Sequence, residues 1–354
     1  MSPRPKRLPS RRQRGPVALL RGAALALAWA GVVGAGCAAD PAADAGPAGW
    51  SVHHIEAGGA LASVFAAAPD DAYAAGGRDG ASLILRYDGV AWREEPTSLA
   101  APLWWVYGDE AGGVWACGEK GALLHRGTAG WEKVTTGTSK TLYGVWIDAA
   151  GEVWAVGGDA HGQPGDAVVL RGGVGGLSAV DVPKDLMPSV LFKVYGTPAG
   201  DVVAVGDSGT VLRLRAGQPG ATWSRDVVPT EGTLTSLWGG GGERLFAVGA
   251  ENAGLMLAHD GEGWTHHAAV APGAALFGVF KAPQGPLFAV GAGARIVEVS
   301  ADGASPPQEP EVRGIIEGTV LHSVFGATGG PVWAVGGNFF ADPADWRGVI
   351  AIRR

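Results

Sequence analysis

Two pairs of adjacent histidines, His53-His54 and His266-His267, are the residues whose type and spacing come closest to a metal site. Neighbouring residues of a β-strand point to opposite faces, so neither pair can hold one ion between its two rings. The sequence contains no His-x-His motif and no closely spaced Cys/His cluster of the kind that binds zinc. We therefore interpret both pairs as solvated side chains of outer strands.

Motifs of covalent catalysis and of phosphate binding are absent from the sequence. No Gly-x-Ser-x-Gly segment presents a nucleophilic serine, and no P-loop is present. The 60 glycines are therefore interpreted as turn residues. We expect no catalytic residue, no cofactor and no enzymatic activity.

A set of loop residues is a better candidate for a site, because binding residues concentrate in loops that a rigid scaffold positions. Most of these residues are acidic, and each follows a glycine that recurs along the chain. They would form an acidic rim around a central axis, where a Ca²⁺ site is a subsidiary hypothesis. The members of this candidate rim are Asp79, Glu119, Lys120, Asp159, Asp207 and Glu251.

A loop near the C-terminus adds Asn338, Phe339, Phe340 and Trp346 to the candidate rim. Aromatic side chains are common anchors of protein interfaces. They are equally the side chains that would plug the mouth of the domain's own channel. The sequence leaves these two interpretations open.

The elements that must position these loops repeat seven times. Each repeat begins with an apolar quartet that starts with leucine and is followed by an aromatic residue, and a glycine stands 15 residues after each leading leucine. Four short strands in about 40 to 45 residues are the blade unit of a β-propeller. The leading leucines are Leu61, Leu103, Leu142, Leu191, Leu234, Leu276 and Leu321, and the glycines are Gly76, Gly118, Gly157, Gly206, Gly249, Gly291 and Gly336.

Positions inside the first two strands of each repeat indicate how the blades pack. The second residue after the leading leucine is Gly or Ser in five repeats, which fits a wedge that narrows toward the axis. Trp105 and Lys193 depart from this pattern, and a lysine near the axis either faces channel water or is paired. Cys117 stands where five other repeats have valine, so we predict a small buried hydrophobic side chain there.

The two ends of the repeat array complement each other. Residues 50–55 have the pattern of a fourth strand that no blade precedes, and the last repeat ends after its third strand at residues 349–352. The N-terminal strand is therefore predicted to complete the last blade, which pairs edges that an open solenoid would leave exposed. The predicted fold is all-β, a seven-bladed β-propeller with four-stranded blades over residues 50–354.

The turns before two fourth strands read Asp88-Gly-Val-Ala-Trp92 and Asp260-Gly-Glu-Gly-Trp264. They resemble the Asp-box turns of BNR and sialidase-type propellers and of the related photosystem assembly factors. The resemblance implies that the carboxylate caps a turn and that the tryptophan packs between strands, without catalysis. Sialidases of similar fold hold a carboxylate with three arginines, whereas Arg78 is the one arginine in the loops after the recurrent glycines.

Residues 1–36 have the marks of a signal peptide. They carry seven basic residues and no acid, and a 15-residue apolar run, shorter than a transmembrane helix needs, ends directly before Cys37. The boundary resembles a bacterial lipoprotein signal, which implies that Cys37 is lipidated; ordinary cleavage nearby, with Cys37 incidental, is the alternative. Residues 37–49 are small residues and prolines, which we expect to form a flexible tether.

The charge of the remaining chain restricts its partners. Without residues 1–36 it has 20 basic and 34 acidic residues, a balance that serves solubility and disfavours nucleic acid and anionic lipid. Contact with the membrane is therefore expected only through the lipid anchor. Ala38 and Ala39 lack the aspartate that resembles an inner-membrane retention signal, so the outer membrane is favoured over the inner.

The sequence thus favours a monomeric, non-catalytic binding or assembly scaffold of the bacterial cell envelope. We expect it to contact an envelope protein through the propeller rim. A lectin-like module that binds envelope polysaccharide is the main alternative, and a degenerate glycoside hydrolase is the other.

Overall fold

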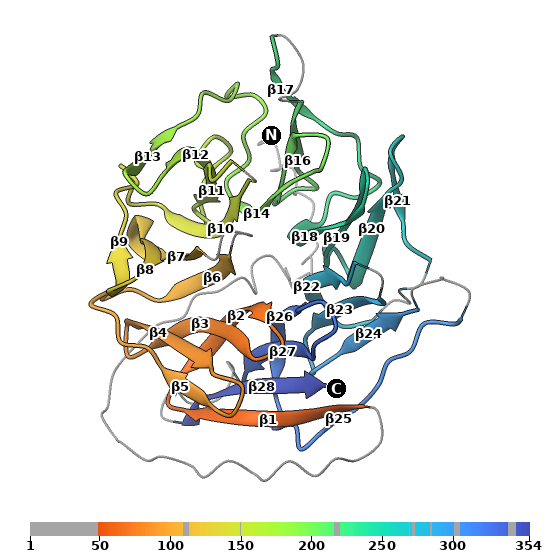
Figure 1. Ribbon diagram of the computed structural model, residues 1–354. Coiled ribbons are helices and arrows are strands. Elements are labelled where there is room, and N and C mark those ends of the chain that lie inside the picture. Colours follow the sequence, from red (N-terminus) through yellow and green to blue (C-terminus); the bar gives the residue numbers. More distant parts are fainter. Residues whose placement is uncertain are drawn as a thin grey trace, which may run out of the picture.

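Seven sheets surround a common axis and follow one another around it in chain order (Figure 1). The structure is a computed structural model that describes residues 49–108, 113–148, 150–215, 220–268, 270, 273–283, 285–300, 305–338 and 345–354. The seven-bladed β-propeller expected from the repeats is confirmed. The signal peptide, Cys37, residues 37–48 of the tether, Phe339 and Phe340 lie outside the described residues. Within the described ranges, no helix is both long and apolar enough to cross a membrane.

Blades 1 to 5 each contain four strands, and the first strand of each blade lies nearest the axis. Blades 1 and 2 contain β2 (Ala60–Ala68), β3 (Asp71–Arg78), β4 (Ala81–Tyr87), β5 (Trp92–Glu94), β6 (Leu103–Gly108), β7 (Val114–Gly118), the 3-10 turn η1 (Glu119–Gly121), β8 (Leu123–Gly127) and β9 (Gly130–Lys133). Blades 3 to 5 contain β10 (Thr141–Ile147), β11 (Val153–Gly158), β12 (Val168–Gly173), β13 (Gly176–Ala179), β14 (Leu191–Gly196), β15 (Asp201–Gly206), β16 (Val211–Arg215), β17 (Trp223–Arg225), β18 (Thr233–Gly241), β19 (Arg244–Ala250), β20 (Gly254–His259) and β21 (Trp264–His266).

Blade 7 is completed by the N-terminal strand, as the sequence predicts. It contains β26 (Val320–Gly326), β27 (Val332–Gly337), β28 (Arg347–Arg353) and β1 (Trp50–Ala57). Strand β1 runs antiparallel to β28, with Trp50 opposite Arg353 and Ala57 opposite Arg347. Figure 1 shows the two strands side by side below the other strands of the blade. The start and the end of the domain therefore share one sheet.

Blade 6 departs from the expected four strands. It contains β22 (Leu276–Lys281), β23 (Leu287–Gly291) and β24 (Ile296–Val299). The segment in the fourth-strand position carries Pro306, Pro307 and Pro310, which have no backbone N–H to donate. Among the described residues of this segment, only Gln308 pairs with β24, and it exchanges two backbone hydrogen bonds of 2.8 and 2.9 Å with Glu298. The next strand, β25 (Val312–Arg313), instead pairs in parallel with β1 as a fifth strand of blade 7.

Aromatic packing holds the joint between blades 7 and 1. His53 of β1 lies edge-on to Tyr87 and to Trp333, with ring centroids 5.7 and 5.2 Å apart. Trp92 of blade 1 also meets Trp333 edge-on, at 5.2 Å. Such pairs each contribute about 0.5–1.5 kcal/mol beyond the burial of their surface. The expectation that both histidine pairs are solvated is therefore wrong for His53, because blade 1 covers the outer strand at this joint.

The recurrent glycine has a steric cause. In every blade the register of the first two strands shifts directly after the leading leucine, which leaves one unpaired bulge residue. The bulge places the backbone carbonyl that precedes the leucine against the glycine of the second strand. A Cβ atom on any of the seven glycines would lie 1.8 to 2.2 Å from that carbonyl oxygen. Only glycine fits, so the interval of 15 residues is the same in all seven repeats.

The small residues near the axis join neighbouring blades. The Ser63 hydroxyl accepts the backbone N–H of Val106 at 3.1 Å, and the Ser323 hydroxyl accepts that of Val64 at 3.3 Å. These contacts agree with the prediction that each blade narrows toward the axis and carries small residues there. Cys117 is buried in the core of blades 2 and 3, as predicted, and burial raises the pKa of its thiol to about 12.

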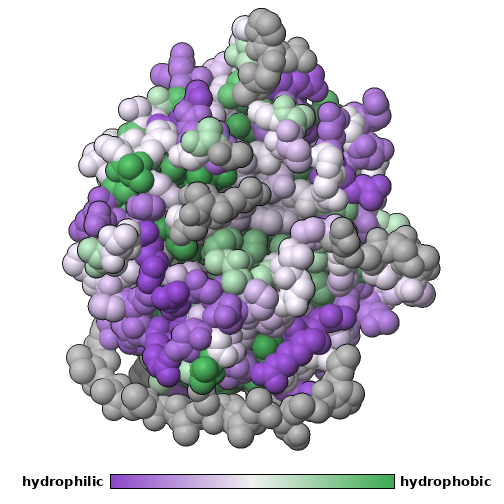
Figure 2. All heavy atoms as spheres, viewed as in Figure 1, coloured by the Kyte–Doolittle hydropathy of each residue, from purple (hydrophilic) through white to green (hydrophobic). Residues whose placement is uncertain are grey.

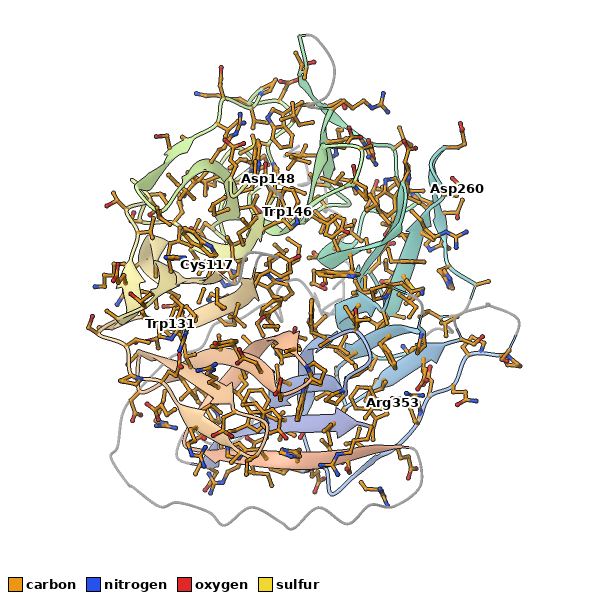
Figure 3. The ribbon with its side chains drawn as sticks, viewed as in Figure 1. Cys117, Trp131, Trp146, Asp148, Asp260 and Arg353 are labelled. Atoms are coloured by element: carbon orange, nitrogen blue, oxygen red, sulfur yellow. The ribbon has the colours of Figure 1, made fainter. Side chains whose placement is uncertain are left out.

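The turns that resemble an Asp box have the local geometry the resemblance implies. Asp88 accepts the backbone N–H groups of Val90 and Ala91 at 3.1 and 2.9 Å, and Asp260 caps its own turn in the same way. Trp92 and the equivalent tryptophan of blade 5 are both buried. Figure 3 shows Asp260 at the outer edge of its blade, far from the axis.

Candidate functional site

The acidic members of the candidate rim come from five consecutive blades and lie at one end of the propeller. Each follows a second strand, and all second strands end on the same side of the ring. None of the five forms an ion pair with another described residue. We call Asp79, Glu119, Asp159, Asp207 and Glu251 the acidic arc.

Short turns fix the backbone of the acidic arc. Asp79 has a φ of 52° between β3 and β4, and Lys120, beside Glu119 in η1, has a φ of 57°. Asp159 accepts the backbone N–H of His161 at 2.9 Å. Partial burial raises the pKa of the Glu119 carboxyl, and the charge of Lys120 opposes that shift. The backbone of the arc is therefore held by its turns, and the Asp207 carboxylate accepts the Ser189 hydroxyl at 2.6 Å.

Asn338 and Trp346, the two remaining members of the candidate rim that the structure describes, are both tied into blade 7. The Asn338 side-chain oxygen accepts the backbone N–H of Arg347 at 2.6 Å. The backbone oxygen of Trp346 accepts the N–H of Gly58 at 2.9 Å, and its side chain is 6% exposed. In this arrangement Trp346 contributes to the packing of the domain and offers little surface to a partner.

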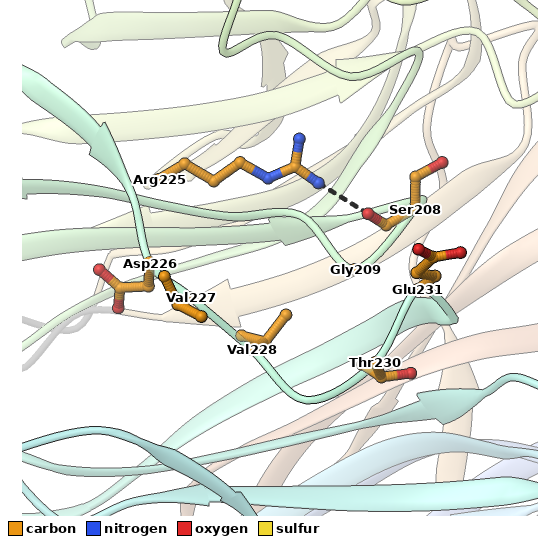
Figure 4. Close-up of a pocket in the computed structure, with 8 residues that line it drawn as sticks. All are labelled: Ser208, Gly209, Arg225, Asp226, Val227, Val228, Thr230 and Glu231. Atoms are coloured by element: carbon orange, nitrogen blue, oxygen red, sulfur yellow. Dashed lines mark hydrogen bonds between the residues drawn. The ribbon is translucent and has the colours of Figure 1, made fainter.

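A groove opens beside the acidic arc, between the turn that joins β15 to β16 and the segment that joins blade 4 to blade 5 (Figure 4). Its volume is about 590 Å³. Val227 contributes an apolar side chain that is 91% exposed, and Arg225 donates to the backbone oxygen of Ser208 at 2.7 Å. At one end Thr230 donates to Glu251 at 2.7 Å, which ties the groove to the arc. The groove is lined by Ser208, Gly209, Arg225, Asp226, Val227, Val228, Thr230 and Glu231.

The bulge residues form a second layer at the same end of the axis. Trp104 and Tyr143 have ring centroids 5.9 Å apart, and those of Tyr143 and Phe192 are 5.1 Å apart. Burial raises the pKa of Tyr143 to about 12, and the charges of Glu119 and Asp159 add to the shift. We call Ala62, Trp104, Tyr143, Phe192, Thr235, Phe277 and His322 the bulge ring.

The opposite end of the axis is closed by the aromatic residues that follow the apolar quartets. Ring contacts join all seven, and Trp238 of blade 5 reaches Tyr107 of blade 2 and Phe325 of blade 7, with centroids 5.9 and 5.1 Å apart. Figure 3 shows one member, Trp146, on the axial side of its blade. Figure 2 shows apolar residues gathered around the axis of the face in view and hydrophilic residues over the outer strands. The seven are Phe65, Tyr107, Trp146, Tyr195, Trp238, Phe280 and Phe325.

The two residues that depart from the pattern of small axial residues meet inside the channel. The Lys193 amine lies 3.9 Å from the centroid of the Trp105 ring and donates to the backbone oxygen of Tyr143 at 3.0 Å. Burial lowers the pKa of Lys193 to about 7. The sequence singled out both residues, but it could not show that they are in contact.

The histidine pairs do not form a metal site. His54 is 3.1 Å from a carboxylate oxygen of Glu56, whereas His53 packs edge-on against the Trp333 ring. His266 contacts the backbone oxygen of Pro229, whereas His267 packs against a phenylalanine ring. Within the part of the chain that the structure describes, no three His, Cys, Asp or Glu residues are grouped so that they could hold a metal ion.

Comparisons with known proteins show the fold. No protein-family model matches the sequence, and no curated protein does. Virginiamycin B lyase from Staphylococcus aureus superposes with a TM-score of 0.65 at 12% identity, over 85% of this chain and 99% of the lyase. YCF48 bound to a D1 peptide gives 0.64 at 14% identity over 89% and 99%, and the WD40 propeller domain of Doa1 gives 0.65 at 10% over 86% and 97%. One of these is an enzyme and another is bound to a peptide, so the fold alone does not decide between catalysis and binding.

Proposed function

We propose that the protein is a non-catalytic binding or assembly scaffold of the bacterial envelope that contacts a protein partner through its propeller rim. The observation that carries this proposal is the acidic arc. Its carboxylates stand on rigid turns without described cationic partners, and a surface of this kind attracts and orients a partner of opposite charge. The partner is therefore a protein with a basic contact surface.

The groove supports the same function. It adjoins Glu251 through Thr230, and it exposes Val227 as an apolar contact within a polar surround. Protein interfaces combine such an apolar centre with a charged rim. The structural similarity to YCF48, which is bound to a peptide, is consistent with a propeller that binds polypeptide.

Display on the envelope completes the proposal. A lipid on Cys37 would anchor the chain, and residues 37–49 would space the propeller from the membrane. The outer membrane is the favoured site, because Ala38 and Ala39 follow the cysteine. The propeller would act as a monomer that presents its rim to the partner.

A crosslinked pull-down of the tagged full-length protein from its native envelope, read by mass spectrometry, tests the proposal. The rim variant carries Asp79→Asn, Asp159→Asn and Glu251→Gln, all at exposed positions. The control variant carries Asp70→Asn in blade 1 and Glu243→Gln and Glu262→Gln in blade 5. These three residues are exposed at the opposite end of the propeller, and their substitution changes the net charge by the same amount as the rim variant.

We expect one partner at near-equal abundance with the wild type and the control, and weaker capture by the rim variant. The difference should shrink as salt rises, because screening removes the contribution of exposed charges. Equal capture by both variants would place the partner away from the rim. If no protein is enriched and a glycan panel shows binding, the lectin-like alternative is correct instead.

A further inference from the structure

The segment that joins β17 to β18 leaves part of its main chain without hydrogen-bond partners. Where the segment begins, Asp226 donates its N–H to the backbone oxygen of Val211 at 2.9 Å, and directly before β18 it accepts the N–H of Gly209 at 2.8 Å. Between these two points, Val227 and Val228 form no hydrogen bond with another residue that the structure describes. Both valines line the groove, so their main-chain donors and acceptors lie along one of its walls.

An equivalent segment of the same molecule shows what can pair with such a position. Thr135 stands four residues after Trp131 in the segment that follows β9, as Val227 stands four residues after Trp223. The backbone oxygen of Thr135 accepts the N–H of Leu177, which belongs to the outer strand β13 of the next blade, at 2.8 Å. A strand therefore hydrogen-bonds to this position in blade 2, whereas the same position in blade 4 is open.

The two valines differ in exposure, as consecutive side chains of a half-covered strand do. Val227 is 91% exposed, and Val228 packs against the core that blades 4 and 5 share. An added strand places its own side chains beside those of the strand it joins. An apolar side chain of the added strand would therefore cover Val227 and remove its surface from water.

The charges around the groove favour basic side chains in the same occupant. Glu231 is exposed on the groove lining, and Thr230 ties the lining to Glu251 of the acidic arc. Neither glutamate forms an ion pair with a described residue. Arg225, the cation of the lining, donates to the backbone oxygen of Ser208 (Figure 4). A lysine or arginine of the occupant would meet carboxylates that have no cation beside them.

We propose that the partner binds this groove with an extended segment of apolar and basic residues, which adds to the main chain of Val227 and Val228 as a short strand. In strand addition, main-chain hydrogen bonds supply affinity and side-chain contacts supply selectivity. A helix could not bind in this way, because its main-chain groups are bonded internally. The inference rests on the proposed function, a protein contact at the rim, and identifies the element of the partner that makes the contact.

Fluorescence anisotropy of labelled peptides with the full-length protein tests the inference. The first probe is a heptapeptide of alternating lysine and valine, and the second is the same peptide with its internal amides N-methylated. The second probe keeps the charge and the side chains but cannot donate to a strand. We expect it to bind about tenfold more weakly, because each lost hydrogen bond weakens binding by about three- to tenfold. A heptapeptide of alternating glutamate and valine should not bind, because the groove and the arc repel it.

Variants of the protein locate the contact. Val227→Ser and Glu231→Gln should each weaken binding of the first probe by about threefold, through lost apolar burial and a lost exposed ion pair. Their controls are Val174→Ser and Glu262→Gln, because Val174 is 67% exposed and Glu262 is also exposed, both at the opposite end of the propeller. The controls should leave the affinity unchanged.

Three results of the peptide assay would overturn the inference: equal affinity for the first two probes, equal losses in the variants and their controls, or no binding of the first probe at millimolar concentration. A dimer in sedimentation that Val227→Ser dissociates would assign the groove to a second copy of the chain and overturn it as well. In the pull-down, a partner that the rim variant loses but Val227→Ser retains would overturn this inference and leave the proposed function standing. If no protein is captured, both are overturned.

Discussion

Replacing Asp226 by asparagine should destabilise the propeller more than replacing Glu95 by glutamine. Both carboxylates stand three residues after the tryptophan of a fourth strand, and both accept the indole N–H of the next blade's tryptophan. The distances are 3.0 Å from Trp264 to Asp226 and 2.8 Å from Trp131 to Glu95. The two sites therefore form a comparable pair that differs in burial and in the neighbouring charge, since Arg86 lies 3.8 Å from Glu95.

The Asp226 site is the more buried of the two. The side chain of Arg213 is 6% exposed and donates to Asp226 at 2.8 Å. The carboxylate of Asp201 lies 3.2 Å from the same guanidinium group. Removing one partner of a buried ion pair costs about 3–5 kcal/mol, because the other charge is left without compensation. Since Asp201 still pairs with Arg213, we expect a loss near the lower limit, about 3 kcal/mol.

The Glu95 site is the less costly one to disrupt. The side chain of Arg126 is 27% exposed, so water can solvate it when the carboxylate is lost. Arg126 also lies 5.6 Å from the centroid of the Tyr73 ring, a contact that the substitution leaves in place. Partly exposed ion pairs contribute about 1 kcal/mol at most, so we expect a loss of about 1 kcal/mol for Glu95→Gln.

Differential scanning calorimetry of the two variants measures the difference. At about 2 °C per kcal/mol for a domain of this size, the melting temperature should fall by about 6 °C for Asp226→Asn and by about 2 °C for Glu95→Gln. Equal shifts, or a larger shift for Glu95→Gln, would refute the reasoning that burial sets the cost of an uncompensated charge. A double-mutant cycle that combines Asp226→Asn with Arg213→Met measures the coupling energy between the Asp226 and Arg213 charges directly.

Four further predictions follow from the same contacts. Desolvation raises the pKa of Asp226, but hydrogen bonds from Arg213 and Trp264 outweigh it and leave the pKa below its usual range. We therefore expect the difference in melting temperature between the wild type and Asp226→Asn to be constant above about pH 4. In melts at lower pH, down to about pH 2, this difference should disappear as Asp226 of the folded protein is protonated. Trp50→Ala should cost about 4 kcal/mol in denaturant unfolding, because Trp50 is 1% exposed and closes the ring. Gly249→Ala should cost several kcal/mol, since its Cβ would lie 1.9 Å from the backbone oxygen of Thr233, while Gly263→Ala, which meets no atom within 4 Å, should change stability by less than about 0.5 kcal/mol. Trp346→Ala should lower the melting temperature by several degrees, because the side chain is 6% exposed; an unchanged melting temperature with lost partner capture would instead assign Trp346 to the interface.

The architecture was predictable from the sequence because its cause is local. A bulge after the leading leucine leaves no room for a Cβ atom on the opposite strand. Each blade therefore has a glycine 15 residues after its leading leucine. The ring closure was predictable for a similar reason, since one strand of a blade remains at the N-terminal end of the array and three remain at the C-terminal end. The loss of the fourth strand in blade 6 could have been inferred from Pro306, Pro307 and Pro310, which cannot donate to a ladder.

The candidate site was less predictable. The sequence identified the acidic residues after the recurrent glycines, because the repeat register places them at one end of the blades. It did not identify the bulge ring, since the recurrent glycine marks the bulge on the opposite strand but the seven bulge residues themselves share no residue type. It left open whether Trp346 anchors a partner or packs against its own domain, and the structure buries this residue in the domain.

The sequence by itself determined the number of blades, their strand order and the closure of the ring, because strand lengths and the steric limits of a glycine act over a few residues. Only the tertiary structure decided which side chains meet at the axis. Lys193 and Trp105 come from blades that are not neighbours in the ring, and their contact requires both the closed ring and the missing side chain of Gly144. Contacts across an axis depend on the positions of whole blades, which no single repeat encodes.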